Sequence, residues 1–317
     1  MKQRISHQTT HGPSTTAPTS STLSLRYQIL EELGRGGMGT VYRVLDRLTQ
    51  TEVALKQLNI SAATLTANPD PEATIVTLDT QAEQHLIALV NEFRTLASLR
   101  HPHVINVLDY GIEAQHPFFT MELLQQRQTI TAVAQAHDVR AKVQLVIQLL
   151  QALTYLHRNG IVHRDVKPGN VLVEQGRVRV LDFGLAVTVD AAQGVAGTLA
   201  YMAPETLRYR IASAQSDLYA VGVILYEIFA DTVPFDGRDV GAILQRAPDI
   251  TRVDAPTSIQ LVIERLLMKD ADDRYRSASD VIQALCAALD MPAPNEDERI
   301  RESFLQASEF VGREAEL

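Results

Sequence analysis

The chain has 317 residues, of which 45% are hydrophobic and 21% charged, and its net charge is −9. This size and composition predict a globular protein with one large or two small cores. The negative charge disfavours a nonspecific binder of nucleic acid or of anionic membranes. The one cysteine, Cys286, excludes a disulfide within the chain and indicates a reducing compartment, so we expect a cytoplasmic protein. We find no apolar run near the ~20 residues of a membrane-spanning helix, and the first residues lack the apolar stretch of a secretory signal.

Two segments have compositions that predict little regular structure. Residues 1–25 are rich in Ser, Thr and Pro and cannot bury enough apolar surface to order themselves, so we expect a disordered leader. Residues 59–82 contain Pro, Asn and Thr and exceed the length that a link between a strand and a helix needs. We expect them to form an insertion on the surface.

Three glycines, Gly34, Gly36 and Gly39, follow the spacing GxGxxG. Dinucleotide-binding folds use the same spacing, but they place a helix directly after the glycines. Here the alternating segments TVYRVL and EVALKQL follow, separated by the polar turn DRLTQT, so the glycines join two strands of a hairpin. Such a loop can cover phosphates, because the missing side chains let backbone N–H groups approach an anion. Lys56, in the segment VALK, would then neutralise phosphate charge.

The segment HLIALVNEFRTLASL has apolar residues at helical spacing and predicts a helix that ends before His101 and Pro102. This helix offers Glu92 as an acidic partner that would keep Lys56 in place, and Glu83, two turns earlier, is the competing candidate. The next apolar segment, FFTMELL at residues 118–124, predicts a strand that runs into a polar segment.

Three further segments, all after residue 138, predict helices. The segment VRAKVQLVIQLLQALTYLHRNG has helical periodicity and a stop signal at Asn159 and Gly160. The segment SAQSDLYAVGVILYEIFADTVPF is apolar enough to predict a buried helix, and DVIQALCAALD predicts the helix that closes the domain.

The densest group of reactive side chains lies between residues 163 and 184. A β-branched alternating run within it predicts a hairpin with its turn at Gln175 and Gly176. Acceptor side chains at the two ends of this hairpin can face one point, and hard oxygen ligands of this kind suit Mg²⁺. A lysine beside them suggests phosphate. The residues concerned are His163, Arg164, Asp165, Lys167 and Asn170 at one end and Asp182, Phe183 and Gly184 at the other.

At these residues, which read HRDVKPGN and DFG, the chain resembles the protein kinase family, over roughly residues 27–290. The Lys-Pro pair is similar to the serine/threonine branch, and GRGGMGTVY is similar to bacterial members. The resemblance implies an α+β, bilobal fold: a small antiparallel β-sheet N-lobe with one helix, αC, and a mainly helical C-lobe. The implied kinase domain is 26–291, with an N-lobe at 26–121, a hinge at 122–126 and a C-lobe at 127–291.

The resemblance also implies a role for each site residue. Asp165 would accept or orient the proton of the substrate hydroxyl, and Lys167 would stabilise the transferring γ-phosphoryl. Lys56, paired with Glu92, would hold the α- and β-phosphates. Asn170 and Asp182 would bind Mg²⁺, with Mn²⁺ as the alternative cation. The implied nucleotide-binding residues are Leu33, Gly34, Gly36, Gly39, Val41, Ala54, Lys56, Met121 as gatekeeper, Glu122 and Leu124 through their backbones, and Leu172. The implied regulatory spine is Leu96, Val107, His163 and Phe183.

The resemblance extends to the segment that would dock substrate, which reads GTLAYMAPE and places Thr198 near Asp165. No hydroxyl group that could carry a phosphate for Arg164 occurs between Asp190 and Gly197. We therefore expect the guanidinium of Arg164 to pair with a carboxylate such as that of Asp190, or the loop to be ordered by a partner. Asp217 would bond the backbone of the catalytic loop, and Glu205 would form a buried ion pair with Arg274. Family members that prefer basic substrates carry acids where this chain has Gln128 and Gly169, so no basic preference is predicted.

Residues 292–317 form a polar, Pro-containing linker followed by FVGREAEL, which resembles the opening of a STAND/AAA-type ATPase domain. We therefore expect the kinase end of a longer kinase–ATPase protein, with the ATPase domain fused or as a partner.

The leading hypothesis is a serine/threonine protein kinase that uses ATP, autophosphorylates and acts on Ser and Thr of protein substrates in intracellular signalling. A pseudokinase that binds nucleotide as a scaffold is the alternative, although the expected catalytic residues are all present. A small-molecule kinase would rarely carry the APE segment and the Arg274 ion pair. We expect neither nucleic acid as a partner nor a membrane segment in this chain.

Overall fold

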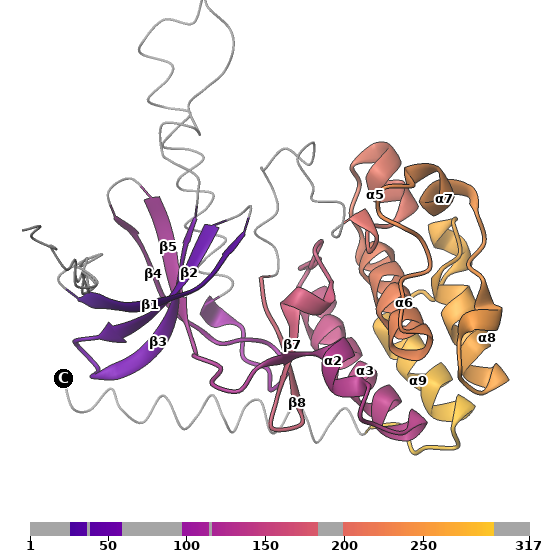
Figure 1. Ribbon diagram of the computed structural model, residues 1–317, viewed down its shortest axis with the longest axis horizontal. Coiled ribbons are helices and arrows are strands. Elements are labelled where there is room, and N and C mark those ends of the chain that lie inside the picture. Colours follow the sequence, from indigo (N-terminus) through magenta and orange to yellow (C-terminus); the bar gives the residue numbers. More distant parts are fainter. Residues whose placement is uncertain (1–25, 37–38, 59–96, 114–115, 183–198, 295–317) are drawn as a thin grey trace, which may run out of the picture.

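The computed structural model describes residues 26–36, 39–58, 97–113, 116–182 and 199–294 (Figure 1). These residues form an antiparallel β-sheet, the N-lobe, and a mainly helical C-lobe, so the predicted bilobal fold is confirmed. The leader at 1–25, the insertion at 59–82 and the predicted helix around Glu92 lie outside the described residues. Among the helices that the structure does describe, none has the length and apolar character needed to cross a membrane.

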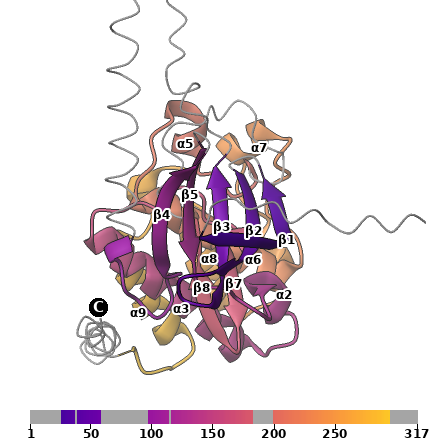
Figure 2. The same cartoon turned by 90° about the vertical axis from the view of Figure 1, so that its left-hand side faces the viewer.

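The N-lobe sheet has the strand order β1-β2-β3-β5-β4, and every neighbouring pair is antiparallel (Figure 2). Its strands are β1 (Tyr27–Gly36), β2 (Gly39–Asp46), β3 (Thr51–Leu58), β4 (Val107–Glu113) and β5 (His116–Met121). The pairing of β1 with β2 confirms that the glycines join a hairpin rather than precede a helix.

The register of this sheet places several predicted nucleotide-binding residues on one face. Val41 lies opposite Lys56, and Ala54 lies opposite Met121. Ala54 and Lys56 are two residues apart on β3, so their side chains point to the same side. On the opposite side, a small apolar cluster that includes Tyr27, Val44, Val53, Leu55 and Phe118 stabilises the sheet.

The C-lobe packs its helices around one large core. The helices are α2 (Ile130–Ala134), α3 (Val139–Arg158), α5 (Pro204–Tyr209), α6 (Ala214–Ala230), α7 (Val240–Gln245), α8 (Thr257–Leu266) and α9 (Ala278–Ala288). The predicted stop of α3 is confirmed, because Asn159 caps the helix and Gly160 follows in the left-handed region at φ 73°. The helix predicted to be buried is α6, which Ser213 and Ser216 start with a capping box.

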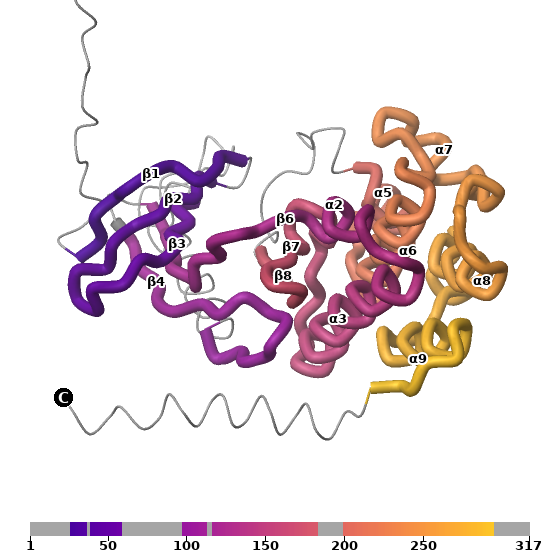
Figure 3. The backbone as a smooth tube through the Cα atoms, turned by 60° about the horizontal axis from the view of Figure 1, so that its bottom comes forward, coloured from indigo at the N-terminus to yellow at the C-terminus, as the bar shows by residue number. Residues whose placement is uncertain are grey.

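A second, smaller sheet lies between the N-lobe strands and the C-lobe helices (Figure 3). It consists of β6 (Gln128–Thr129), β7 (Val171–Glu174) and β8 (Arg177–Val180). The predicted turn at Gln175 and Gly176 is confirmed, and both residues have positive φ, 50° and 75°, as a type I′ turn requires. Because β7 and β8 are antiparallel and Val171 lies opposite Val180, the segment before Val171 and the segment after Val180 lie next to each other.

Candidate active site

The carboxylate of Asp217, near the start of α6, anchors the loop from His163 to Asn170 through hydrogen bonds. Asp217 accepts the backbone N–H groups of His163 at 2.8 Å and Arg164 at 2.9 Å, as predicted. It also lies 2.8 Å from the Nε2 atom of His157 on α3, a contact that the sequence did not indicate. Arg164 has φ 70°, a left-handed conformation that is costly for a residue with a side chain. The Asp217 contacts hold the backbone in this shape.

His163 connects this loop to the residue before Asp182. The ring is fully buried, and burial lowers its pKa despite the neighbouring carboxylates. The neutral ring donates from Nε2 to the carbonyl of Leu181 at 2.9 Å, and its Nδ1 accepts the N–H of Asp165 at 3.3 Å. These two contacts select one tautomer. Val107, another predicted member of the spine, is also buried, whereas Leu96 and Phe183 lie outside the described residues.

The predicted catalytic carboxylate, Asp165, is oriented by two donors on the same oxygen. Lys167 Nζ lies 2.8 Å from Asp165 Oδ2, and Asn170 Nδ2 donates to the same atom at 2.8 Å. Asn170 Nδ2 also donates to the backbone carbonyl of Asp165 at 2.8 Å. Because both of these side-chain contacts fall on Oδ2, Oδ1 is the oxygen that the described residues leave open to an incoming hydroxyl group.

An ion pair joins the two lobes. Lys56 Nζ on β3 lies 2.6 Å from Asp182 Oδ2, and the Lys56 side chain is almost completely buried. Glu92, the expected partner of Lys56, lies outside the described residues. The N–H of Leu181 donates to the carbonyl of Asn170 at 2.9 Å. The structure therefore brings together Lys56, Asp165, Asn170 and Asp182, which come from three separate parts of the chain.

Two of these residues have oxygen atoms that fit a divalent cation. Asp182 Oδ1 is buried and has no hydrogen-bond partner among the described residues, and such an orphaned carboxylate oxygen fits a cation. Asn170 uses its amide nitrogen for Asp165, so its carbonyl oxygen is the atom available to a metal. One carboxylate and one amide oxygen suit Mg²⁺, which completes its shell with water and phosphate oxygens.

A pocket of about 150 Å³ lies between the lobes beside these residues. It contains most of the predicted nucleotide-binding residues: Leu33, Gly34, Val41, Ala54, Met121, Glu122, Leu124 and Leu172. Arg127, Gly169, Leu181 and Asp182 complete its lining. Lys56 lies beside this pocket, because its Nζ atom forms an ion pair with Asp182, one of the lining residues.

Two predicted glycines, Gly36 and Gly39, do not line this pocket. A Cβ atom at Gly39 would lie 2.1 Å from the carbonyl oxygen of Gln57 on β3. Gly39 is therefore required for the close approach of β2 to β3, whereas a Cβ at Gly36 would meet nothing within 4 Å.

The side chain of Glu122 has a structural role that the sequence did not reveal. Its carboxylate accepts the N–H of Asn106 at 3.0 Å and Nη2 of Arg179 at 2.6 Å. The N–H of Glu122 donates to the carbonyl of Asn106 at 3.1 Å, and Arg179 Nη1 donates to the carbonyl of Pro102 at 2.9 Å. This network fixes the start of the connection between the lobes against β4 and β8. No local sequence signal marks it, because the partners are 16 and 57 positions away.

The predicted ion pair between Glu205 and Arg274 is present and bidentate, with both N–O distances at 2.8 Å. Burial opposes ionisation of Glu205, but the hydrogen bonds and charge of Arg274 outweigh it and lower the pKa of Glu205. Thr188, Asp190 and Thr198 lie outside the described residues, so the expectations about them stay predictions. The exposed side chain of Arg164 has no partner among the residues that the structure describes.

Comparison with known proteins adds an independent finding. The sequence profile of the protein kinase domain matches residues 27–291. The crystal structure of the Mycobacterium tuberculosis PknI kinase domain superposes with a TM-score of 0.65 at 25% identity, covering 87% of this chain and 100% of that one.

Several curated bacterial proteins are similar in sequence. Serine/threonine-protein kinase PrkC of Bacillus subtilis is 30% identical over 290 residues, which is 86% of this chain and 42% of that protein. The DNA damage-responsive serine/threonine-protein kinase RqkA of Deinococcus radiodurans is 36% identical over 277 residues, 81% of this chain and 38% of that protein. Serine/threonine-protein kinase PknA of Mycobacterium tuberculosis is 32% identical, with 87% and 64% covered. The chain thus spans about two fifths of the length of PrkC and RqkA.

Proposed function

The chain belongs to the protein kinase domain family, and on that premise we propose that it is an ATP-dependent serine/threonine protein kinase. The observation that carries the proposal is the convergence of Lys56, Asp165, Asn170 and Asp182 beside one pocket between the lobes. The similarity to bacterial serine/threonine-protein kinases supports the choice of Ser and Thr hydroxyls as acceptors.

In the proposed reaction, the hydroxyl oxygen of a substrate Ser or Thr attacks the γ-phosphorus of ATP, the bond to the β-γ bridging oxygen breaks, and ADP leaves. Asp165 accepts the hydroxyl proton on Oδ1, because Lys167 and Asn170 occupy Oδ2. Lys167 stabilises negative charge on the transferring group, and Lys56 stabilises it on the remaining phosphates. Mg²⁺ or Mn²⁺, held by Asn170 and Asp182, supplies further charge neutralisation when bound.

A pseudokinase that binds ATP without transferring phosphate is the competing function. The Asp165→Asn variant separates the two when it is compared with the wild-type chain in labelled ATP and Mg²⁺. We expect phosphate incorporation to fall about 10²- to 10⁴-fold, the usual contribution of a general base, while ATP affinity changes little. Phosphosite mapping of the wild-type product should find Ser or Thr. Equal incorporation by both proteins, or none by the wild type, would refute the proposal.

We further propose the wider context of this domain. We place the kinase domain at 26–291, with a leader at 1–25, an N-lobe at 26–121, a hinge at 122–126 and a C-lobe at 127–291. We propose a cytoplasmic location, supported by the single cysteine Cys286. The segment FVGREAEL supports a fused or partner ATPase domain. Sequencing downstream of this segment tests that assignment, since an ATPase domain requires a GxxxxGK[ST] motif there.

A further inference from the structure

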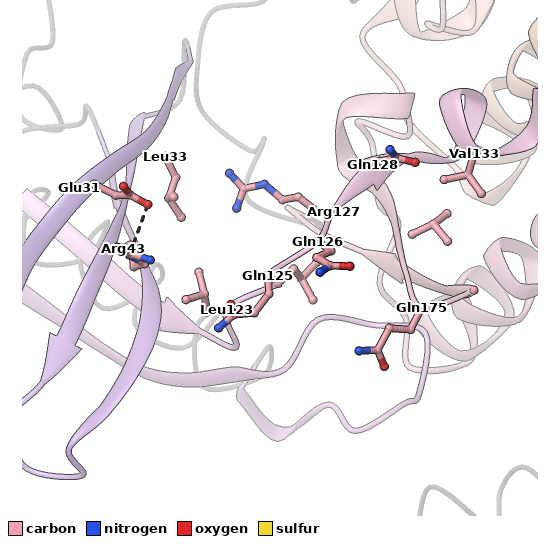
Figure 4. A pocket seen from close by; sticks show the side chains of 13 residues that line it. Glu31, Leu33, Arg43, Leu123, Gln125, Gln126, Arg127, Gln128, Val133 and Gln175 are labelled. Carbon is pink, nitrogen blue, oxygen red and sulfur yellow. Dashed lines mark ion pairs between the residues drawn. The ribbon is translucent and has the colours of Figure 1, made fainter.

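A second pocket, larger than the nucleotide pocket, lies along the connection between the lobes (Figure 4). Its volume is about 690 Å³, which falls within the ~300–1,000 Å³ of typical ligand sites. The two pockets share Leu33, Leu124 and Arg127 as lining residues, so they are direct neighbours. A molecule in the second pocket would lie next to a nucleotide in the first.

Arg127 gives the second pocket its net charge. The other charged side chains in its lining, Glu31 and Arg43, form an ion pair with an N–O distance of 3.3 Å. Arg127 is exposed and has no hydrogen bond or ion pair with any other described residue. Figure 4 shows its side chain extended from the connection between the lobes toward Leu33 of β1. An unpaired guanidinium at this place offers two parallel donors to a carboxylate or a phosphate group.

The remaining polar side chains of this pocket are amides, from Gln125, Gln126, Gln128 and Gln175. None of these four side-chain amide groups forms a hydrogen bond with another described residue. Each amide presents both donors and an acceptor, which match the N–H and C=O groups of an extended polypeptide. A single cation among neutral amides suits a peptide with an acidic side chain better than a nucleic acid, whose phosphates recur along the strand.

The backbone that carries these side chains is fixed before any ligand binds. Glu174, the last residue of β7, accepts the N–H of Gln125 at 2.6 Å and the N–H of Gln126 at 3.2 Å with the same oxygen. Arg127 and Gln128 follow directly, and Gln128 pairs with Val173 in the small sheet. Such preorganisation reduces the entropy that a ligand must overcome on binding.

We propose that this pocket binds the substrate segment beside the acceptor hydroxyl, and that Arg127 selects an acidic or phosphorylated side chain in that segment. The inference rests on the proposed kinase function and names its substrate class. The proposal is supported by the contact between the two pockets, because Arg127 also lines the nucleotide pocket together with Gly169 and Asp182. Gly169 belongs to the same loop as Asp165, so Arg127 lines a pocket together with the loop that would receive the acceptor hydroxyl.

The test compares peptides that share one Ser or Thr and differ only in having Glu, phosphoserine or Lys at each flanking position. With the wild-type chain, we expect about a tenfold higher kcat/KM for the acidic peptide at one or two positions, as for one charge-assisted hydrogen bond. Arg127→Gln should abolish this preference, and Arg127→Glu should invert it in favour of Lys. The KM for ATP is measured in both variants as well, because Arg127 also lines the nucleotide pocket. Comparison of Glu with phosphoserine distinguishes a carboxylate from a phosphate as the preferred group.

The matched control is Arg252→Glu, which makes the same charge change at an exposed arginine between α7 and α8. This variant should keep the wild-type preference, and thermal unfolding should show that all variants are folded. Transfer without any charge preference, or a preference that survives Arg127→Glu, would overturn this inference and leave the proposed kinase function intact. A raised KM for ATP with an unchanged peptide preference would overturn it by assigning Arg127 to the nucleotide. Failure of the wild-type chain to phosphorylate any peptide or itself would refute the proposed function.

Discussion

At the scale of single residues, His163 shows how burial and hydrogen bonding set a charge state. The ring is fully buried, and burial lowers its pKa below the ordinary value of 6.5 even though carboxylates are near. It must stay neutral to accept the N–H of Asp165 at Nδ1 while it donates to Leu181. Protonation would remove that acceptor from the loop that carries the catalytic carboxylate.

We therefore predict that the free energy of unfolding decreases as the pH falls below about 6.5. In that range the unfolded chain binds a proton that folded His163 does not, and one such proton contributes at most ~1.4 kcal/mol per pH unit. His163→Gln keeps one donor and one acceptor but does not titrate, so its unfolding energy should depend less on pH. Urea unfolding between pH 5 and 7.5 measures the difference. Identical pH slopes for both proteins would contradict the prediction.

At the scale of elements, Arg274 joins α5 to the turn that follows α8. Its guanidinium binds both oxygens of Glu205 and also donates to the carbonyls of Met268, Gln215 and Lys269. The Arg274 side chain is completely buried, and Glu205 is 17% exposed. Removal of either partner leaves the other charge uncompensated in a site where water has little access.

We predict that Arg274→Met lowers the free energy of unfolding by about 3–5 kcal/mol, the usual cost of breaking a buried pair from one side. The double variant Glu205→Gln/Arg274→Met should recover part of this loss, because no unpaired carboxylate remains. Denaturant unfolding measures both. The control is Arg246→Met, at a side chain that is 73% exposed, where we expect a change within about 0.5 kcal/mol. If Arg274→Met and Arg246→Met lowered the free energy of unfolding by the same amount, burial would not determine the loss of stability.

The start of the connection between the lobes depends on a second pair, Glu122 and Arg179. Their N–O distance is 2.6 Å, and Glu122 also holds Asn106 through two hydrogen bonds. The family resemblance assigns the backbone of Glu122 to the adenine edge. A shift of this backbone should therefore weaken nucleotide binding more than it slows phosphate transfer.

We predict that Glu122→Gln and Arg179→Met each raise the KM for ATP with a smaller change in kcat. The double variant should show less than the sum of the two effects, with a coupling energy of about 1 kcal/mol. Steady-state kinetics at varied ATP concentration checks both statements. Arg177→Met, on the same strand but exposed, is the matched control. If Arg177→Met raised the KM for ATP as much as Arg179→Met does, the pair of Glu122 and Arg179 would have no role in nucleotide binding. Simple addition of the effects of Glu122→Gln and Arg179→Met on the KM would lead to the same conclusion.

The sequence predicted those elements whose signal is local. The turn at Gln175 and Gly176 and the stop of α3 at Gly160 follow from residues that favour positive φ, and both are present. Pairs distant in sequence, such as Glu205 and Arg274, 69 positions apart, were predictable only through the family resemblance. The contacts of Glu122 and Glu174 were missed, because strand register alone brings their partners close.

At the scale of the whole molecule, the candidate site exists only where the two lobes meet. Lys56 comes from the N-lobe sheet, whereas Asp165, Asn170 and Asp182 come from the loops around β7 and β8. Motif spacing predicted which residues would take part, but their contact depends on how the lobes are placed. That Arg127 lines two pockets was not predictable from its neighbours in the chain, because an exposed arginine has no distinctive local pattern.

The position of Asp182 between the lobes leads to a prediction about nucleotide binding. Asp182 Oδ2 contacts Lys56, whereas its buried Oδ1 has no hydrogen-bond partner among the described residues. A cation bound to Oδ1 together with ADP would stabilise the folded protein by mass action, by about 2.7 kcal/mol at a ligand concentration 100 times Kd. We therefore expect ADP with Mg²⁺ to raise the Tm of the wild-type chain more than ADP with a chelator.

Asp182→Asn should lose the part of this Tm increase that depends on Mg²⁺ and keep the part that ADP produces alone, because the neutral amide is a weaker ligand for a hard cation. Asp165→Asn makes the same substitution at a carboxylate whose Oδ2 is already occupied by Lys167 and Asn170, so it should keep both parts. Differential scanning fluorimetry of the three proteins with ADP, with and without Mg²⁺, measures these increments. If Asp165→Asn lost the Mg²⁺-dependent part and Asp182→Asn retained it, the cation would bind on the catalytic loop rather than at the meeting point of the lobes.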